Sequence, residues 1–176
     1  MAGEPRDSLT FLALALDSAG KPIPVVNTDP ATGLFLGTFT AAADVEAFVR
    51  TYPMALLAAG VGPLVANDAY ASRAVWERFR KDTYHGPRVV WGREVNLLLL
   101  GLADRVADDP AGPFREALDR TLEAVQASGL EYAELWSYRI EDGRLKPTRY
   151  GTTSDIQLWS STGLAVQFAL ARLGLR

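Results

Sequence analysis

The chain has 176 residues, enough for one domain with a sizeable hydrophobic core and short for two. Apolar residues make up 48% of it and charged residues 22%, as in globular proteins, and no segment approaches the roughly 20 successive apolar residues of a membrane span. The formal net charge is −3, whereas binding to a nucleic-acid backbone requires a concentrated basic face. We therefore expect neither nucleic acid nor membrane as a partner.

The chain contains no cysteine and a single histidine, His85, which excludes disulfides, thiolate metal sites and clusters of histidine ligands. We therefore expect no metal and no cofactor, and any chemistry should depend on carboxylates. Residues 1–8 lack the pattern of a secretory signal and are predicted to be a disordered tail, followed by a single helical domain over 9–176. The predicted location is cytoplasmic.

Residues 9–39 are predicted to be extended, with turns at 18–22 and 29–33 that contain glycine and proline. The later periodic segments predict five helices, at 41–51, 73–81, 93–106, 114–127 and 158–173. The helix over 93–106 contains an unbroken leucine run and should be buried on most sides, whereas the helix over 114–127 is amphipathic. A polar loop is predicted over 137–153. Alternating buried and amphipathic helices indicate helical hairpins in two layers.

Four segments carry a resemblance to a known family, and they occur in the family's order: "LALALDSAGKPIPVVNTDPATGLFLGTF", "GVGPLVANDAYASRAVWERFRKDTYHGPRVVWGREVNLLLLGLA", "AELWSY" and "SDIQLWSSTGLAV". They resemble the C-terminal part of the catalytic domain of (α/α)6-toroid, or six-hairpin, glycoside hydrolases of the glycogen-debranching, amylo-α-1,6-glucosidase-like kind. The resemblance implies a mainly α fold, built from the hairpins of a partial toroid with a small extended segment near the N-terminus. A full ring of twelve helices needs upwards of roughly 200 residues, so the chain would supply about half of it.

The resemblance also assigns roles to residues. The glutamate of the family's Glu-Leu-aromatic segment is the catalytic base, which implies this role for Glu134. The positions that line the family's sugar subsite correspond to Tyr84, His85, Gly86 and Trp91.

Each of these residues has a plainer alternative. Glu134 is either the base or a surface glutamate beside a buried Leu-Trp pair, and Trp136 either stacks on a sugar or packs in the core. His85 either binds a sugar hydroxyl or ties its own turn together. Glu94 is the best candidate for a second carboxylate, although a position at a helix start also favours a capping or salt-bridge role.

The function implied by the resemblance is that of an inverting α-glucosidase or debranching-type domain, acting on an oligosaccharide or α-glucoside. Inversion requires a general acid as well as a base, with carboxyls about 6.5–9.5 Å apart, and only the base is evident in this chain. The alternatives are a non-catalytic carbohydrate-binding or scaffold protein and a helical interaction module. Because the inner-helix face over 97–102 would be exposed in a half-ring, a homo-oligomer or a complementing chain is expected.

Overall fold

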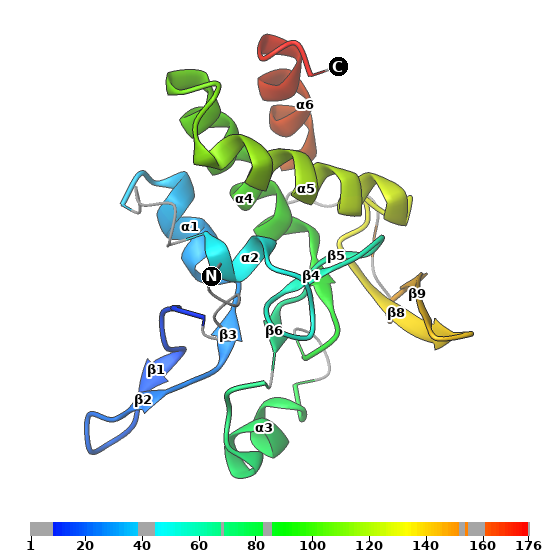
Figure 1. Cartoon of the computed structure of the whole chain (residues 1–176). Coiled ribbons are helices and arrows are strands. Elements are labelled where there is room, and N and C mark those ends of the chain that lie inside the picture. The colour runs from blue at the N-terminus through cyan, green and yellow to red at the C-terminus, as the bar shows by residue number, and fades with distance from the viewer. Residues whose placement is uncertain are drawn as a thin grey trace, which may run out of the picture.

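The structure is a computed structural model in which residues 9–38, 45–67, 69–82, 86–151, 154 and 161–175 are described. Within these residues the chain forms six helices and four small antiparallel sheets (Figure 1). The helices are α1 (Pro30–Phe35), α2 (Glu46–Val49), α3 (Arg73–Phe79), α4 (Gly92–Asp108), α5 (Pro113–Ser128) and α6 (Thr162–Arg172). The strands are β1 (Ala15–Leu16), β2 (Pro22–Ile23), β3 (Val26–Asn27), β4 (Leu57–Ala58), β5 (Gly62–Pro63), β6 (Ala66–Asn67), β7 (Val90–Trp91), β8 (Leu135–Glu141) and β9 (Arg144–Arg149).

This mixed α/β architecture corrects the predicted fold class. A toroid is built from successive pairs of long helices, whereas only α4 and α5 form such a consecutive pair among the described segments. Helices α1, α2 and α3 are short, and between them the chain forms paired two-residue strands instead of helical hairpins. The mainly α, partial (α/α)6 fold is therefore wrong, and so is the assignment of this chain to that glycoside hydrolase family.

Helix α4 forms the centre of the fold, with α1, α5 and α6 packed around it (Figure 1). Its leucines 97, 98, 99 and 102 are buried, which confirms the prediction of an inner helix. Helix α1 approaches most closely at Gly101, where an added Cβ would lie 2.8 Å from Leu34 Cγ and 2.9 Å from the backbone nitrogen of Phe35. The exposed inner face that suggested an oligomer is thus covered by the chain itself, and an oligomer or complementing chain stays a prediction.

The amphipathic helix predicted at 114–127 is confirmed as α5. It begins with Pro113, whose ring fixes a helical φ where no backbone donor is needed, and Gly129 ends it in the left-handed conformation at φ 63°. The helices predicted near 73–81 and 158–173 are present as α3 and α6, although residues 155–160 lie outside the described part. Of the helix predicted over 41–51, α2 is described and 41–44 are not; the predicted tail at 1–8 also lies outside.

Two segments predicted as non-helical loops or extended chain form regular elements. Residues 30–35 form α1, because Pro30 at its first position favours a helix start as readily as a turn. Most of the loop predicted over 137–153 is the hairpin β8–β9, in which Trp136 pairs with Arg149 and Glu141 with Arg144. Its turn is Asp142-Gly143, both with positive φ (51° and 72°), as the two-residue type I′ turn requires.

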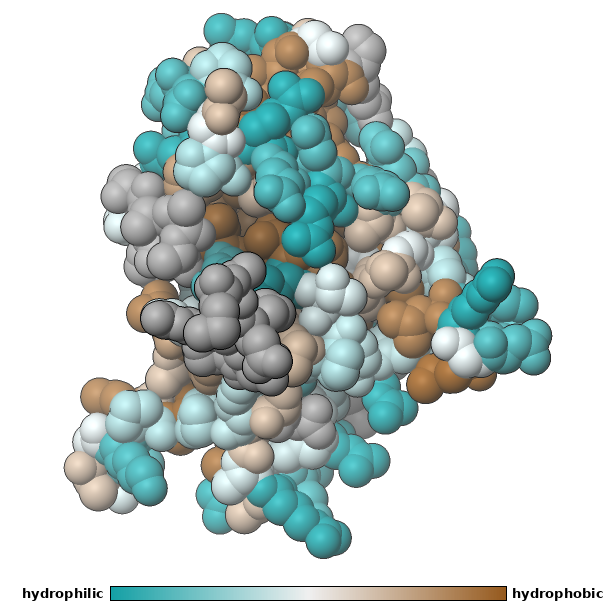
Figure 2. Space-filling model, viewed as in Figure 1, coloured by the Kyte–Doolittle hydropathy of each residue, from teal (hydrophilic) through white to brown (hydrophobic). Residues whose placement is uncertain are grey.

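Strand β7 pairs with the start of β8, and this three-stranded sheet joins the centre of the chain to its C-terminal third. The β1–β2 hairpin, helix α3 and the β8–β9 hairpin project from the core in different directions (Figure 1). Figure 2 shows the same three projections with mostly polar tips, and apolar surface over the end that carries α6, where Leu164 and Phe168 are exposed. None of the described helices is both long and apolar enough to cross a lipid bilayer.

Candidate functional site

The structure brings Trp91 and Glu134 together at the start of α4. Trp91 pairs with Leu135 across β7 and β8, and the backbone N–H of Gly92 donates to the carbonyl oxygen of Glu134 at 2.8 Å. A Cβ at Gly92 would lie 2.6 Å from the carbonyl oxygen of Ala133, so the close approach requires glycine. Tyr84 and His85 lie outside the described residues, and their predicted roles stay predictions.

Glu134 is buried, with 4% of its surface exposed, so it is not the surface glutamate of the plainer interpretation. The backbone N–H of Ser154 donates to its Oε2 atom at 3.5 Å. Trp91 beside it is half-buried, and its ring lies 5.2 Å from the guanidinium of Arg93 in a cation–π contact. The role of Glu134 as a base remains a prediction.

Trp136 and Gly86 have structural positions instead of open ligand-binding ones. The Trp136 side chain is fully buried, and its Nε1–H donates to the carbonyl oxygen of Val61 at 2.7 Å. A sugar cannot stack on this ring without opening the core, so the core alternative describes Trp136. Gly86 is also buried, and a side chain there would overlap the carbonyl oxygen of Asp82. Its contribution is to let two backbone segments approach.

Glu94, in the first turn of α4, has the largest pKa shift among the described carboxyls. Burial raises its pKa to about 7, against the lowering effect of the adjacent Arg93, and the negative charge of Asp29 raises it further. One carboxylate oxygen forms an ion pair with Arg93, while Oε2 has no hydrogen-bond partner among the described residues. The salt-bridge role considered for Glu94 is therefore present, and its carboxyl keeps a proton near neutral pH in a substantial fraction of molecules.

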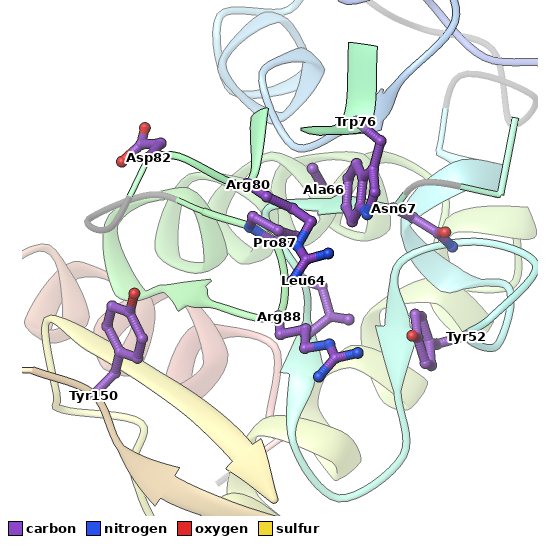
Figure 3. A pocket seen from close by; sticks show the side chains of 10 residues that line it. All are labelled: Tyr52, Leu64, Ala66, Asn67, Trp76, Arg80, Asp82, Pro87, Arg88 and Tyr150. Carbon is purple, nitrogen blue, oxygen red and sulfur yellow. The ribbon is translucent and has the colours of Figure 1, made fainter. Parts of the chain in front are cut away.

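A cavity of about 470 Å³ lies between α3, the loop before β4 and the segment that leads into β7 (Figure 3). The described residues that line it are Tyr52, Leu64, Ala66, Asn67, Trp76, Arg80, Asp82, Pro87, Arg88 and Tyr150. Figure 3 shows Tyr52 and Tyr150 on opposite sides, with Trp76, Arg80 and Arg88 between them. Neither Glu94 nor Glu134 is among these lining residues.

Helix α3 supplies one wall of the cavity because Trp76 and Arg80 are four residues apart and share a helix face. The hydroxyl of Ser72 caps the helix by accepting from the backbone N–H of Val75 at 3.3 Å. Trp76 stacks on Phe79, with ring centroids 5.9 Å apart. Both rings, with Trp91, pack against a small core of Val25, Val65 and Ala66, which fixes α3 to the rest of the fold.

The opposite wall is held by Asn67, a buried side chain at the end of β6. Its amide nitrogen donates to the carbonyl oxygens of Pro53 and Ala55, both at 2.6 Å, and its Oδ1 accepts from the backbone N–H of Ala69. These bonds hold the loop that carries Tyr52. The Tyr52 ring also contacts that of Tyr138 on β8, with centroids 6.2 Å apart. Asn67 therefore shapes the cavity, and Tyr52 faces it.

Arg88 also lines the cavity, and its backbone has an unusual conformation, with φ at 71°. The Ser137 hydroxyl donates to the carbonyl oxygen of Arg88 at 2.6 Å and anchors this turn to β8. Within the described ranges, neither Arg80 nor Arg88 lies within ion-pair distance of a carboxylate. Their guanidinium groups are available to a ligand.

The chain was compared with protein-family models and with curated proteins. No protein-family model matches the chain, and no curated protein matches it. The resemblance drawn from the four sequence segments therefore has no support from either comparison, in agreement with the fold.

The sequence interpretation missed most of the residues that line the cavity. A signal was present for Trp76 and Arg80, since a capped helix with an aromatic and a basic residue at i and i+4 presents both on one face. Tyr52, Arg88 and Tyr150 come from three loops far apart in the chain, and no local pattern marks them as neighbours.

Proposed function

We propose that the chain binds a saccharide in the cavity between Tyr52, Trp76 and Tyr150. The observation that carries the proposal is the combination of three aromatic rings with two guanidinium groups around one space of about 470 Å³. That volume is within the range of about 300–1,000 Å³ that is usual for small-molecule sites.

The residue types suit a polyhydroxylated ligand. Aromatic rings pack against the C–H faces of sugars, while tyrosine and tryptophan also carry hydrogen-bonding groups at their edges. The two arginines add rigid sets of N–H donors that match closely spaced oxygen atoms. Of the described lining side chains, only Leu64 and Pro87 are purely apolar and larger than alanine, which disfavours a hydrocarbon ligand.

Calorimetric titration of the full chain with a panel of neutral and acidic monosaccharides and of maltooligosaccharides tests the proposal. We expect saturable binding of at least one of these sugars, weakened at least tenfold by Tyr52→Ala because the variant removes one side of the cavity. Tyr132→Ala is the matched control, since Tyr132 is exposed and does not line the cavity. Absence of saturable binding across the panel, or equal weakening by both variants, contradicts the proposal.

A second candidate is hydrolysis of a glycosidic bond, with Glu134 in the role of base that the family resemblance implied. The observation that favours it is the pKa of Glu94, raised to about 7, because a general acid must hold its proton near neutral pH. Both residues are buried, and the backbone of Glu134 is hydrogen-bonded to Gly92 at the start of α4. Turnover of a chromogenic α-glucoside that is abolished by Glu134→Gln supports this candidate. Absence of turnover, with sugar binding intact, leaves the binding function alone.

A further inference from the structure

We infer that the saccharide bound in this cavity is acidic, with its anionic group held between Arg80 and Arg88. The inference rests on the proposed function and specifies the class of ligand. It comes from the charge of the cavity and from the conformation of one of its arginines.

The two arginines of the cavity have no carboxylate partner among the described residues. Several arginines elsewhere are paired with carboxylates, among them Arg50 with Glu46, Arg73 with Glu77 and Arg115 with Asp119. In the described ranges no carboxylate reaches the guanidinium of Arg80 or Arg88. Figure 3 shows both side chains extending into the same space, with Asp82, the one carboxylate of the described lining, at the edge.

The cavity, as far as its lining is described, is consequently positive in a chain that is negative overall. Its described lining contains two arginines and one aspartate, whereas the whole chain has a formal net charge of −3. A ligand that presented only hydroxyl groups would offer the two guanidinium groups neutral hydrogen-bond acceptors. A carboxylate or phosphate group would accept charge-assisted hydrogen bonds from both, and these are roughly twice as strong as neutral ones.

Arg88 also occupies a backbone conformation that arginine disfavours. The left-handed region costs most L-residues roughly 1–2 kcal/mol, and glycine occupies it freely. Among the described residues Asp142 is the other non-glycine case, and aspartate in a turn tolerates it well. The chain thus carries arginine at a position where glycine would be less strained, and the Ser137–Arg88 hydrogen bond holds the turn in place. Such retained strain is typical of residues that contact a ligand.

Glucose, glucuronic acid and glucose 6-phosphate form a matched set of probes, because they share one ring and differ at the sixth carbon. We expect the full chain to bind at least one of the two acids ten or more times more tightly than glucose at low ionic strength. The preference should decrease at about 0.5 M salt, as screening weakens charge pairs at an accessible site. Binding of glucuronic acid alone identifies a carboxylate site, and binding of glucose 6-phosphate alone a phosphate site; either result supports the inference.

Two variants and two controls assign the effect to the arginines. Arg80→Gln and Arg88→Gly should each reduce the preference for the acid at least fivefold, and Arg88→Gly should remain folded because it relieves the backbone. Arg78→Gln, on the same helix but outside the cavity, and Asp142→Gly, at the other strained position, should leave the preference unchanged.

The outcomes separate the inference from the proposed function. Equal affinities for glucose and both acids overturn the inference and leave saccharide binding standing. A preference for an acid that survives both arginine variants also overturns it. If none of the three probes binds while a larger neutral oligosaccharide does, the inference falls alone; if no sugar binds, both fall.

Discussion

Replacement of Glu94 by glutamine tests the central electrostatic feature of the structure. Burial raises the pKa of this carboxyl from 4.5 to about 7 in the folded chain. Below pH 4.5 the carboxyl is protonated in both the folded and the unfolded chain, and its contribution to stability is fully present. As the pH rises toward 7, the unfolded chain loses the proton while the folded chain keeps it, so unfolding becomes more favourable. Above pH 7 both states are ionised and the loss is complete.

The size of this loss follows from the two pKa values. Each tenfold difference in acid strength corresponds to about 1.4 kcal/mol, so the rise in pKa from 4.5 to about 7 corresponds to at most about 3.5 kcal/mol. Glutamine has nearly the same shape and no charge at any pH. The Glu94→Gln variant should therefore escape the loss, at the expense of the Arg93 ion pair.

Urea unfolding of the wild type and the variant at pH 4 and pH 8 measures the effect. Between these pH values we expect the free energy of unfolding of the wild type to fall by about 2–3 kcal/mol more than that of Glu94→Gln. Glu77→Gln is the control, since Glu77 forms an exposed pair with Arg73 and such pairs contribute little. If Glu94→Gln follows the wild type across this range, the reasoning from burial is refuted.

Three further changes test the packing and the strained turn. Trp136→Phe removes the hydrogen bond to Val61 and part of a fully buried ring, and should lower the free energy of unfolding by about 2–4 kcal/mol in urea; a loss below about 1 kcal/mol would contradict the core role. Gly101→Ala pushes α1 away from α4 and should cost about 1–3 kcal/mol by thermal unfolding, whereas Gly163→Ala, whose nearest neighbour would lie 3.9 Å away, should be neutral; equal effects would count against the close contact. Arg88→Gly should raise the free energy of unfolding by about 0.5–1 kcal/mol, and a decrease would argue against strain at this position.

The sequence predicted the long helices well, because their signals are local. The leucine run of α4 and the amphipathic spacing of α5 place these helices within a few residues of their observed bounds. Pro113 and Gly129 mark the ends of α5. In each case, the residues that decide the structure lie within the element itself.

The β8–β9 hairpin was missed although its turn carries a recognisable signal. Asp142-Gly143 favours a type I′ turn, but the flanking segments are rich in arginine, lysine and proline and lack the alternation of a half-buried strand. The pairing is visible only in the fold, where Val90 joins Trp136 across 46 residues. Without this sheet, the resemblance to a helical family was the stronger pattern, and it led to the wrong fold.

The candidate site was predictable only in part, for the same reason. The fold brings Trp91 and Glu134 together, but neither residue lines the cavity. The walls of the cavity are positioned by Asn67 and Ser137, through hydrogen bonds to backbone that is distant in sequence. A sequence pattern identifies a residue that suits a role, but it does not report which loops meet.

The bond between Trp136 and Val61 links positions 75 residues apart and has a bearing on synthesis of the protein. Val61 is synthesised long before Trp136. The core around Val61 is therefore incomplete until the strand that carries Trp136 has been made. The cavity is completed later still, because Tyr150 forms one of its sides. During translation the emerging segment therefore exposes apolar surface that the folded chain buries.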